Sequence, residues 1–151
     1  MITNEITIAP FLTAFVEAYR ADEPASERKR IAYLDVLLRR CVEATSDRGL
    51  CDGCRALLAV ERVFNPVDPF ASAMGIEKLI YILGVFVHSP WLRSDVAMEA
   101  AQWRFVRELV RILEVTPVVV SNGYDDEIEW LREHIDRGLR RTSQRRSARR
   151  R

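Results

Sequence analysis

The last fifteen residues of the chain contain eight arginines and no acidic residue. These arginines are Arg137, Arg140, Arg141, Arg145, Arg146, Arg149, Arg150 and Arg151. Residues 137–151 therefore carry a formal charge of +8, whereas residues 1–136 hold 15 basic and 22 acidic residues, a formal charge of −7. An arginine placed near a phosphate displaces condensed counterions, so such a segment is typical of arms that bind nucleic acid without recognising its sequence. The alternative interpretation is a solvated tail that only aids solubility.

A second set of arginines lies in a helix that we predict at about 91–115. Arg104, Arg107 and Arg111 are spaced i, i+3 and i+7, so they share one helical face about 10 Å long. A row of this kind can follow phosphates along a strand. Glu108 and Glu114 lie nearby, and the alternative is a solvent-facing side whose arginines pair with local acids. We include the three arginines with the eight C-terminal ones as predicted nucleic-acid-binding residues.

Cys51 and Cys54 form a C-x-x-C pair, and Cys41 is the third cysteine. Two thiolates at this spacing can bind zinc, but a tetrahedral site needs two further ligands, and only Cys41, His88 and His134 remain. We therefore predict no metal site and regard the three cysteines as weak candidates. The other interpretations are unligated thiols and a redox pair. A redox pair typically lies where a helix begins beside a strand, and here a helix start is predicted without a strand.

No sequence motif of an enzyme is present. The chain lacks a glycine-rich phosphate loop, a G-x-S-x-G nucleophile motif and an H-E-x-x-H metal motif. The acidic residues Asp125, Asp126 and Glu127 are typical of a helix N-terminus, where they complement the helix dipole. The three tryptophans can stack on bases, although tryptophans more often fill helical cores. We expect a non-enzymatic protein without a cofactor.

Six helices are predicted to position these residues. Apolar spacing and capping signals place them after Pro10, after Ser26, at about 52–64, 69–88 and 91–115, and from Asp125 onward. Prolines separate several of them, because proline lacks an amide donor and restricts the residue before it. Residues 118–120 are expected to form an extended buried connector.

The predicted fold is all-α, a single-domain bundle of about six helices over residues 1–141 with an arginine-rich C-terminal tail at 142–151. The chain has 151 residues, 48% hydrophobic and 30% charged, which is sufficient for one core without metal or disulfides. We expect this core to include Leu34, Leu38, Leu79, Leu83, Trp103 and Leu131. The tail has no apolar pattern and is not expected to fold by itself.

Hydropathy and cysteine usage predict that the protein is neither inserted in a membrane nor secreted. The longest apolar run, residues 79–87, has nine residues and is too short to cross a hydrocarbon core of about 30 Å. The first residues show no positive segment before an apolar one, so no secretory signal is predicted. An odd number of cysteines is not typical of a secreted protein that is held together by disulfides. We expect a cytoplasmic protein.

The charge distribution predicts a protein that binds nucleic acid, RNA or single-stranded DNA, as a subunit of a ribonucleoprotein or nucleoprotein assembly. In this hypothesis the basic segment neutralises phosphates, and the acidic remainder contacts a protein partner or a second copy of the chain. The alternative hypothesis is a helical protein-binding module or inhibitor whose acidic surface occupies a basic site on a partner enzyme.

Overall fold

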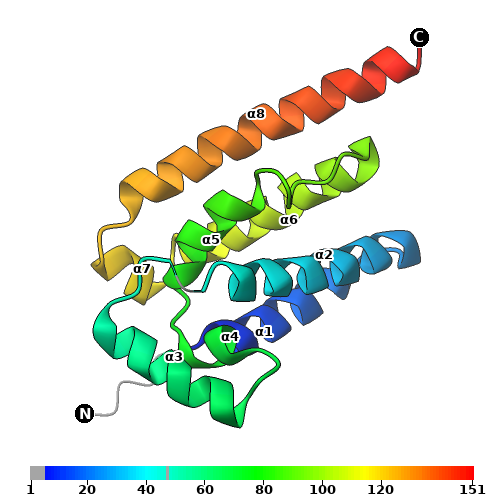
Figure 1. The fold of residues 1–151 in the computed structure, drawn as a ribbon. Helices are drawn as coiled ribbons and strands as arrows, with labels where there is room; N and C mark the ends of the chain where they lie inside the picture. Colours follow the sequence, from blue (N-terminus) through cyan, green and yellow to red (C-terminus); the bar gives the residue numbers. More distant parts are fainter. Residues whose placement is uncertain (1–5, 47) are drawn as a thin grey trace. The chain divides into compact units, whose positions relative to one another are not determined.

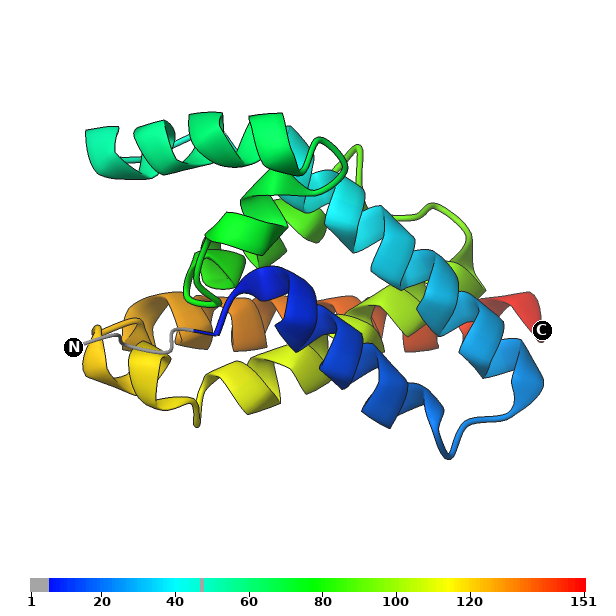
Figure 2. The ribbon, with the colours of Figure 1, turned by 90° about the horizontal axis from the view of Figure 1, so that it is seen from below.

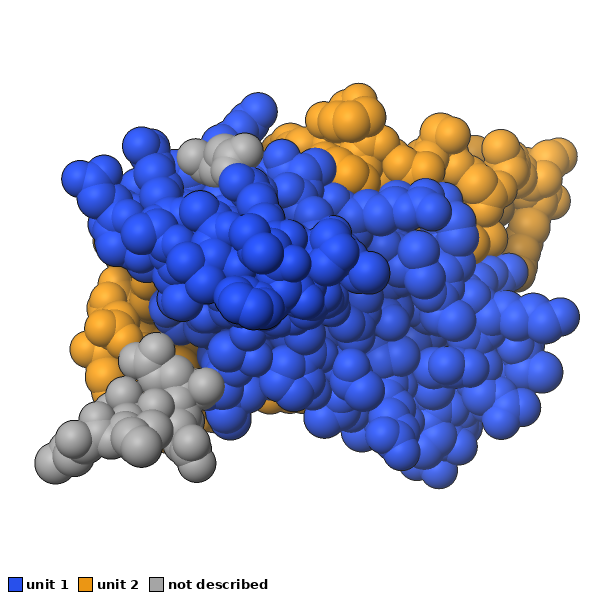
Figure 3. Space-filling model, turned by 60° about the horizontal axis from the view of Figure 1, so that its bottom comes forward, with its two compact units in different colours: residues 1–82 blue, residues 83–151 orange. Residues whose placement is uncertain are grey.

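The computed structural model describes residues 6–46 and 48–151, and it confirms the predicted all-α class, with no β-strand among these residues (Figure 1 and Figure 2). Within the described residues the helices are α1 (Ile8–Arg20), α2 (Ala25–Ala44), α3 (Asp52–Phe64), α4 (Pro69–Ala73), α5 (Lys78–Phe86), α6 (Val96–Leu113), α7 (Pro117–Ser121) and α8 (Asp125–Arg149). None of them has the length and apolar character needed to span a membrane. The chain divides into two compact units, residues 1–82 and 83–151 (Figure 3).

The first unit has its core where α1, α2 and α4 pack on one another. Leu34 and Leu38 of α2 are buried as predicted, and so is Leu79 near the start of α5. Near the end of α2, the Glu43 carboxylate accepts hydrogen bonds from the N–H groups of Phe70 (2.8 Å) and Ala71 (3.2 Å). These amides belong to the first turn of α4, so a side chain of α2 satisfies donors that a short helix would otherwise leave unpaired.

α3 differs from its neighbours because Leu58 is its only buried residue. Leu57, Val60 and Phe64 are exposed, although all three are apolar. The helix packs on α4 through its other side. α3 therefore presents apolar side chains as well as its N-terminal turn to solvent.

In the second unit, α8 lies along α6 and runs in the opposite direction (Figure 1). Trp103 of α6, Leu131 of α8 and Leu83 of α5 are buried as predicted. A Cβ atom added to Gly138 of α8 would overlap the Trp103 indole. The absence of a side chain at residue 138 therefore lets α8 approach α6 closely enough for the tryptophan to fill the space between them.

The helix predicted at 69–88 is divided into α4 and α5. Between them, the carbonyl of Met74 accepts a hydrogen bond from Ile8 N–H at 3.0 Å, and Ile76 N–H donates to the carbonyl of Ile6 at 3.3 Å. This short stretch thus pairs its backbone with Ile6 and with Ile8, the first residue of α1, which interrupts the helix. Apolar periodicity cannot show such a pairing, because it joins positions almost seventy residues apart.

Two other boundaries differ from the prediction. Residues 118–120 are helical in α7, where Pro117 occupies the first turn, rather than an extended connector. α6 begins at Val96 rather than near residue 91, because Asp95 caps it by accepting a hydrogen bond from Met98 N–H at 2.9 Å.

The segment at 142–151 continues the last helix, since α8 extends to Arg149. Thr142 is buried, and its hydroxyl donates to the carbonyl of Leu139 at 2.9 Å. Arginine has a high helix propensity, and cations in the last turns complement the negative end of the helix dipole. The charge pattern that suggested an unstructured tail therefore also favours a long helix.

Candidate nucleic-acid interface

α8 has two sides with different chemistry. One side carries the buried stripe Ile128, Leu131, Ile135, Gly138 and Thr142. An adjacent side carries Trp130, His134, Arg137 and Arg141, which we call the outer row. Their spacing of i, i+4, i+7 and i+11 places them on one face of the helix. At 1.5 Å per residue the outer row is about 16 Å long.

The first part of the outer row is a cluster of aromatic rings. The ring centroid of Trp130 lies 3.8 Å from that of His134 and 5.9 Å from that of His88, which follows α5. The centroids of the two histidines are 5.7 Å apart. Trp130 is 42% exposed. The cluster is therefore a partly open group of rings whose planes are inclined by 24–55° to one another, and the exposed part of Trp130 is where a base can stack.

Backbone carbonyls orient both imidazole rings of this cluster. Nδ1 of His88 lies 2.7 Å from the carbonyl oxygen of Gly84, and Nδ1 of His134 lies 3.2 Å from that of Trp130. A carbonyl oxygen can only accept, so each Nδ1 is the donor. The rings are thus held in place, and their Nε2 atoms take no part in these bonds.

The second part of the outer row leads into the basic end of the chain. Arg137 makes an exposed ion pair with Glu133 at 3.7 Å, a type that contributes little to stability. Four other arginines are exposed and make no ion pair within the described residues: Arg140, Arg141, Arg146 and Arg149. Arg150 and Arg151 follow the end of α8 and are exposed as well. No acidic residue follows Asp136, so Arg141, Arg146 and Arg149 have no carboxylate three or four residues away along α8, whereas Arg140 lies four residues after Asp136.

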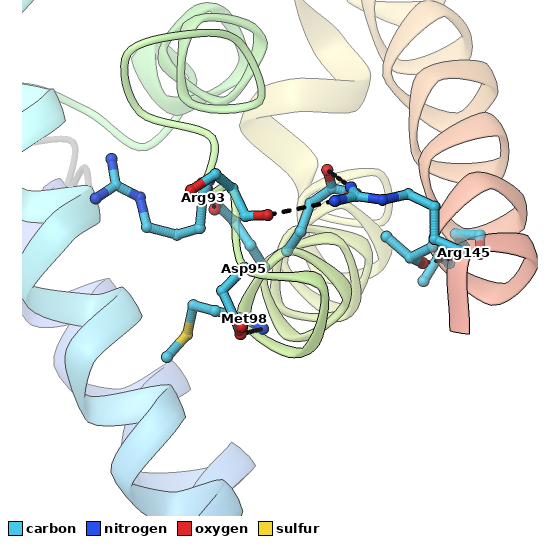
Figure 4. Close-up of polar contacts among 9 residues, drawn as sticks. Arg93, Asp95, Met98 and Arg145 are labelled. Atoms are coloured by element: carbon cyan, nitrogen blue, oxygen red, sulfur yellow. Dashed lines mark hydrogen bonds and ion pairs between the residues drawn. The ribbon is translucent and has the colours of Figure 1, made fainter. Parts of the chain in front are cut away.

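Arg145 is placed differently from the other arginines of α8. Figure 4 shows its side chain directed from α8 toward the start of α6. Its Nη1 donates to Oε1 of Glu99 at 3.2 Å, and its Nη2 donates to the carbonyl of Ser94 at 3.4 Å. Glu99 is only 5% exposed. Arg145, one of the eight predicted C-terminal arginines, thus joins two helices and is less available to a ligand.

A buried amide organises the segment before α6. Gln102 is fully buried, and its Nε2 donates to the carbonyls of Phe86 (3.1 Å) and Trp91 (3.2 Å). Its Oε1 accepts from Arg93 N–H at 3.0 Å. Glu99 and Gln102 are not among the residues predicted from the sequence. The sequence feature that could have revealed them is their position, because both are polar residues that lie on the same helical face as Trp103 and its buried neighbours in α6.

The predicted arginine row on α6 is partly neutralised. Arg111 Nη1 lies 2.7 Å from Oε1 of Glu108, and Arg107 Nε lies 3.8 Å from the same oxygen. Arg104 is half-buried. For Arg107 and Arg111 this geometry favours the alternative interpretation, a solvent-facing side that pairs with local acids.

The three cysteines do not converge on one site. Cys41 is buried in α2, and burial raises the pKa of its thiol to about 12. Cys51 and Cys54 lie at the start of α3, where Cys51 is exposed. No group of three or more histidine, cysteine or acidic side chains suited to a metal ion occurs in the part of the chain that the structure describes.

Comparison with protein-family models, with curated protein sequences and with solved structures gave no match to this chain.

Proposed function

We propose that this chain binds single-stranded nucleic acid, RNA or DNA, as a non-enzymatic subunit of a nucleoprotein assembly, and that α8 provides the contact surface. The observation that carries the proposal is the outer row, in which a partly exposed tryptophan continues directly into exposed Arg137 and Arg141. Arg137 makes only an exposed ion pair with Glu133, and Arg141 makes none within the described residues. Phosphate neutralisation and base stacking are the two contributions that binding of a single strand requires.

The outer row distributes these contributions along one helix. Arg137 and Arg141, with Arg140 beside them, provide cations for consecutive phosphates, and their release of counterions makes binding dependent on salt. Trp130 with His134 provides the stacking surface. A single strand fits this arrangement better than a duplex, because its bases are free to leave their own stack.

The experiment is a salt titration of binding to an unstructured oligonucleotide. The triple variant Arg137→Gln, Arg140→Gln, Arg141→Gln removes three exposed cations from α8. The slope of log affinity against log salt should become shallower by about 2 units, at about 0.7 per phosphate contact on a single strand. The matched control is Arg28→Gln, Arg40→Gln, Arg55→Gln, which removes three exposed cations from α2 and α3 and has the same net charge. Its slope should equal that of the wild type.

A second variant separates stacking from charge. Trp130→Leu should weaken binding roughly tenfold at every salt concentration and leave the slope unchanged, because stacking releases no counterions. Circular dichroism checks that each variant is folded.

Equal slopes for the wild type and the triple α8 variant would contradict the proposal. The alternative function, a protein-binding module or inhibitor with an acidic surface, would then be favoured. A pull-down with and without nuclease treatment tests it directly, since a protein partner is retained when nucleic acid has been digested.

A further inference from the structure

The first turn of α3 contains two thiols in different environments. Cys51 is the N-cap residue, with an extended backbone (φ −71°, ψ 164°), and its Sγ accepts the N–H of Cys54 at 3.4 Å. Cys51 is exposed and Cys54 is half-buried, and neither forms a disulfide in the structure. This hydrogen bond holds the sulfur of Cys51 next to the backbone of Cys54.

The same geometry makes the two thiols chemically unequal. Hydrogen bonds from the backbone amide of Cys54, and then from its side chain, lower the pKa of Cys51, and the positive charge of Lys78 adds to this effect. The pKa of Cys54 is raised, first because its thiol donates to Cys51 and then by burial. Cys51 is thus the better thiolate and Cys54 the proton-bearing partner.

The third thiol differs from both, because Cys41 is buried within α2 and its pKa is raised to about 12. It therefore provides an internal reference for an unreactive cysteine. The pair lies in the first unit and involves no residue of the outer row, so this inference does not depend on the proposed function.

We propose that Cys51 and Cys54 are a redox-active dithiol that reduces a low-molecular-mass disulfide of the glutathione type, with Cys51 as the nucleophile and Cys54 as the resolving cysteine. The exposure of Cys51 at a helix N-terminus gives a small disulfide access to the sulfur. The position of Cys54 three residues later, with its N–H on that sulfur, places the resolving residue beside the bond that it must break.

The exchange has two balanced steps. The Cys51 thiolate attacks one sulfur of the disulfide, so a bond between Cys51 and that sulfur forms, the original sulfur–sulfur bond breaks, and the first small thiolate leaves. Cys54 then loses its proton to water and attacks Cys51, which forms the Cys51–Cys54 disulfide and releases the second small thiolate. The protein gives up two electrons, and the small disulfide becomes two thiols.

The test uses the full chain, first reduced and then incubated with glutathione disulfide, followed by mass spectrometry of peptides. The wild type should form the Cys51–Cys54 disulfide, with no glutathione retained and with Cys41 still reduced. Cys54→Ser should retain one glutathione on Cys51, and Cys51→Ser should react with glutathione disulfide at least about tenfold more slowly. Serine is a good N-cap residue, so Cys51→Ser should keep α3 intact, as circular dichroism can verify.

Stable glutathione on Cys51 of the wild type would overturn the resolving role of Cys54. Reaction of Cys54 at the wild-type rate in the Cys51→Ser variant would overturn the assignment of Cys51 as the nucleophile. Formation of only intermolecular disulfides, seen as dimers on a non-reducing gel, would also refute the proposal.

Discussion

The contact between Arg145 and Glu99 should stabilise the packing of α8 on α6, and a double-mutant cycle can measure its contribution. Oε1 of Glu99 accepts from Arg145, whereas its Oε2 has no hydrogen-bond partner among the described residues. The two side chains differ in exposure, at 43% for Arg145 and 6% for Glu99. Loss of the arginine would therefore leave a buried carboxylate without its cation, whereas loss of the carboxylate would leave an arginine that water can solvate.

This asymmetry determines the expected magnitudes. Removing one partner of a fully buried ion pair costs about 3–5 kcal/mol. Because Arg145 is partly exposed, we expect Arg145→Ala to lower the free energy of unfolding by about 1.5–3 kcal/mol. Glu99→Gln should cost about 1 kcal/mol or less, since a neutral amide is easier to bury than a charge. In the Glu99→Gln background, Arg145→Ala should cost only about 0.5 kcal/mol.

The assay is urea unfolding of the four proteins of the cycle, followed by far-UV circular dichroism. Arg141→Ala is the matched control, because it removes an exposed arginine of the same helix that makes no ion pair with any residue that the structure describes. Its cost should stay within about 0.5 kcal/mol. An equal cost of Arg145→Ala in both Glu99 backgrounds, or a cost no larger than that of Arg141→Ala, would refute the reasoning. The same contacts imply that deletion of residues 142–151 destabilises the second unit, so point substitutions are the better test of nucleic-acid binding.

Two further predictions concern single residues of each unit. Gly138→Ala should destabilise the protein by about 1–3 kcal/mol, because the new Cβ overlaps the Trp103 indole. Gly53→Ala is the control and should be neutral or stabilising, because its new Cβ meets open space. Thermal melts compare the two variants, and an unchanged melting temperature for Gly138→Ala would contradict the packing described. Burial raises the pKa of Glu43 above its ordinary value of 4.5, so the folded state binds this proton more tightly than the unfolded state. The contribution of Glu43 to the free energy of unfolding should therefore rise as the pH falls through the range just above 4.5. Urea unfolding at about pH 7 and about pH 5 tests this: on going to the lower pH, the free energy of unfolding of Glu43→Gln should rise less, or fall more, than that of the wild type. An identical change in both proteins would argue against this assignment.

The features that depend on local chemistry could be predicted from the amino-acid sequence. Helical spacing of apolar residues and capping signals predicted the all-α class and the burial of residues such as Leu38 and Trp103. Formal charge can be counted without a structure, so the accumulation of arginines after Asp136 and the C-x-x-C pair at a helix start were both visible. The nucleic-acid interface predicted from that charge stays a prediction.

Which of these groups come into contact could not be predicted, because it depends on how the helices pack. The division of the helix at 69–88 depends on backbone pairing with Ile6 and Ile8 at the start of α1, which lie far away in sequence. Along the extension of α8 to Arg149, Thr142 is buried and Arg145 pairs with Glu99 of α6, so one of the eight arginines is held by another helix while others face solvent. The aromatic cluster joins His88 to Trp130 and His134, which are more than forty residues away in the sequence. The physical reason is common to all three cases: local spacing specifies which face of a helix is apolar or charged, whereas the contacts of that face depend on the elements that pack against it.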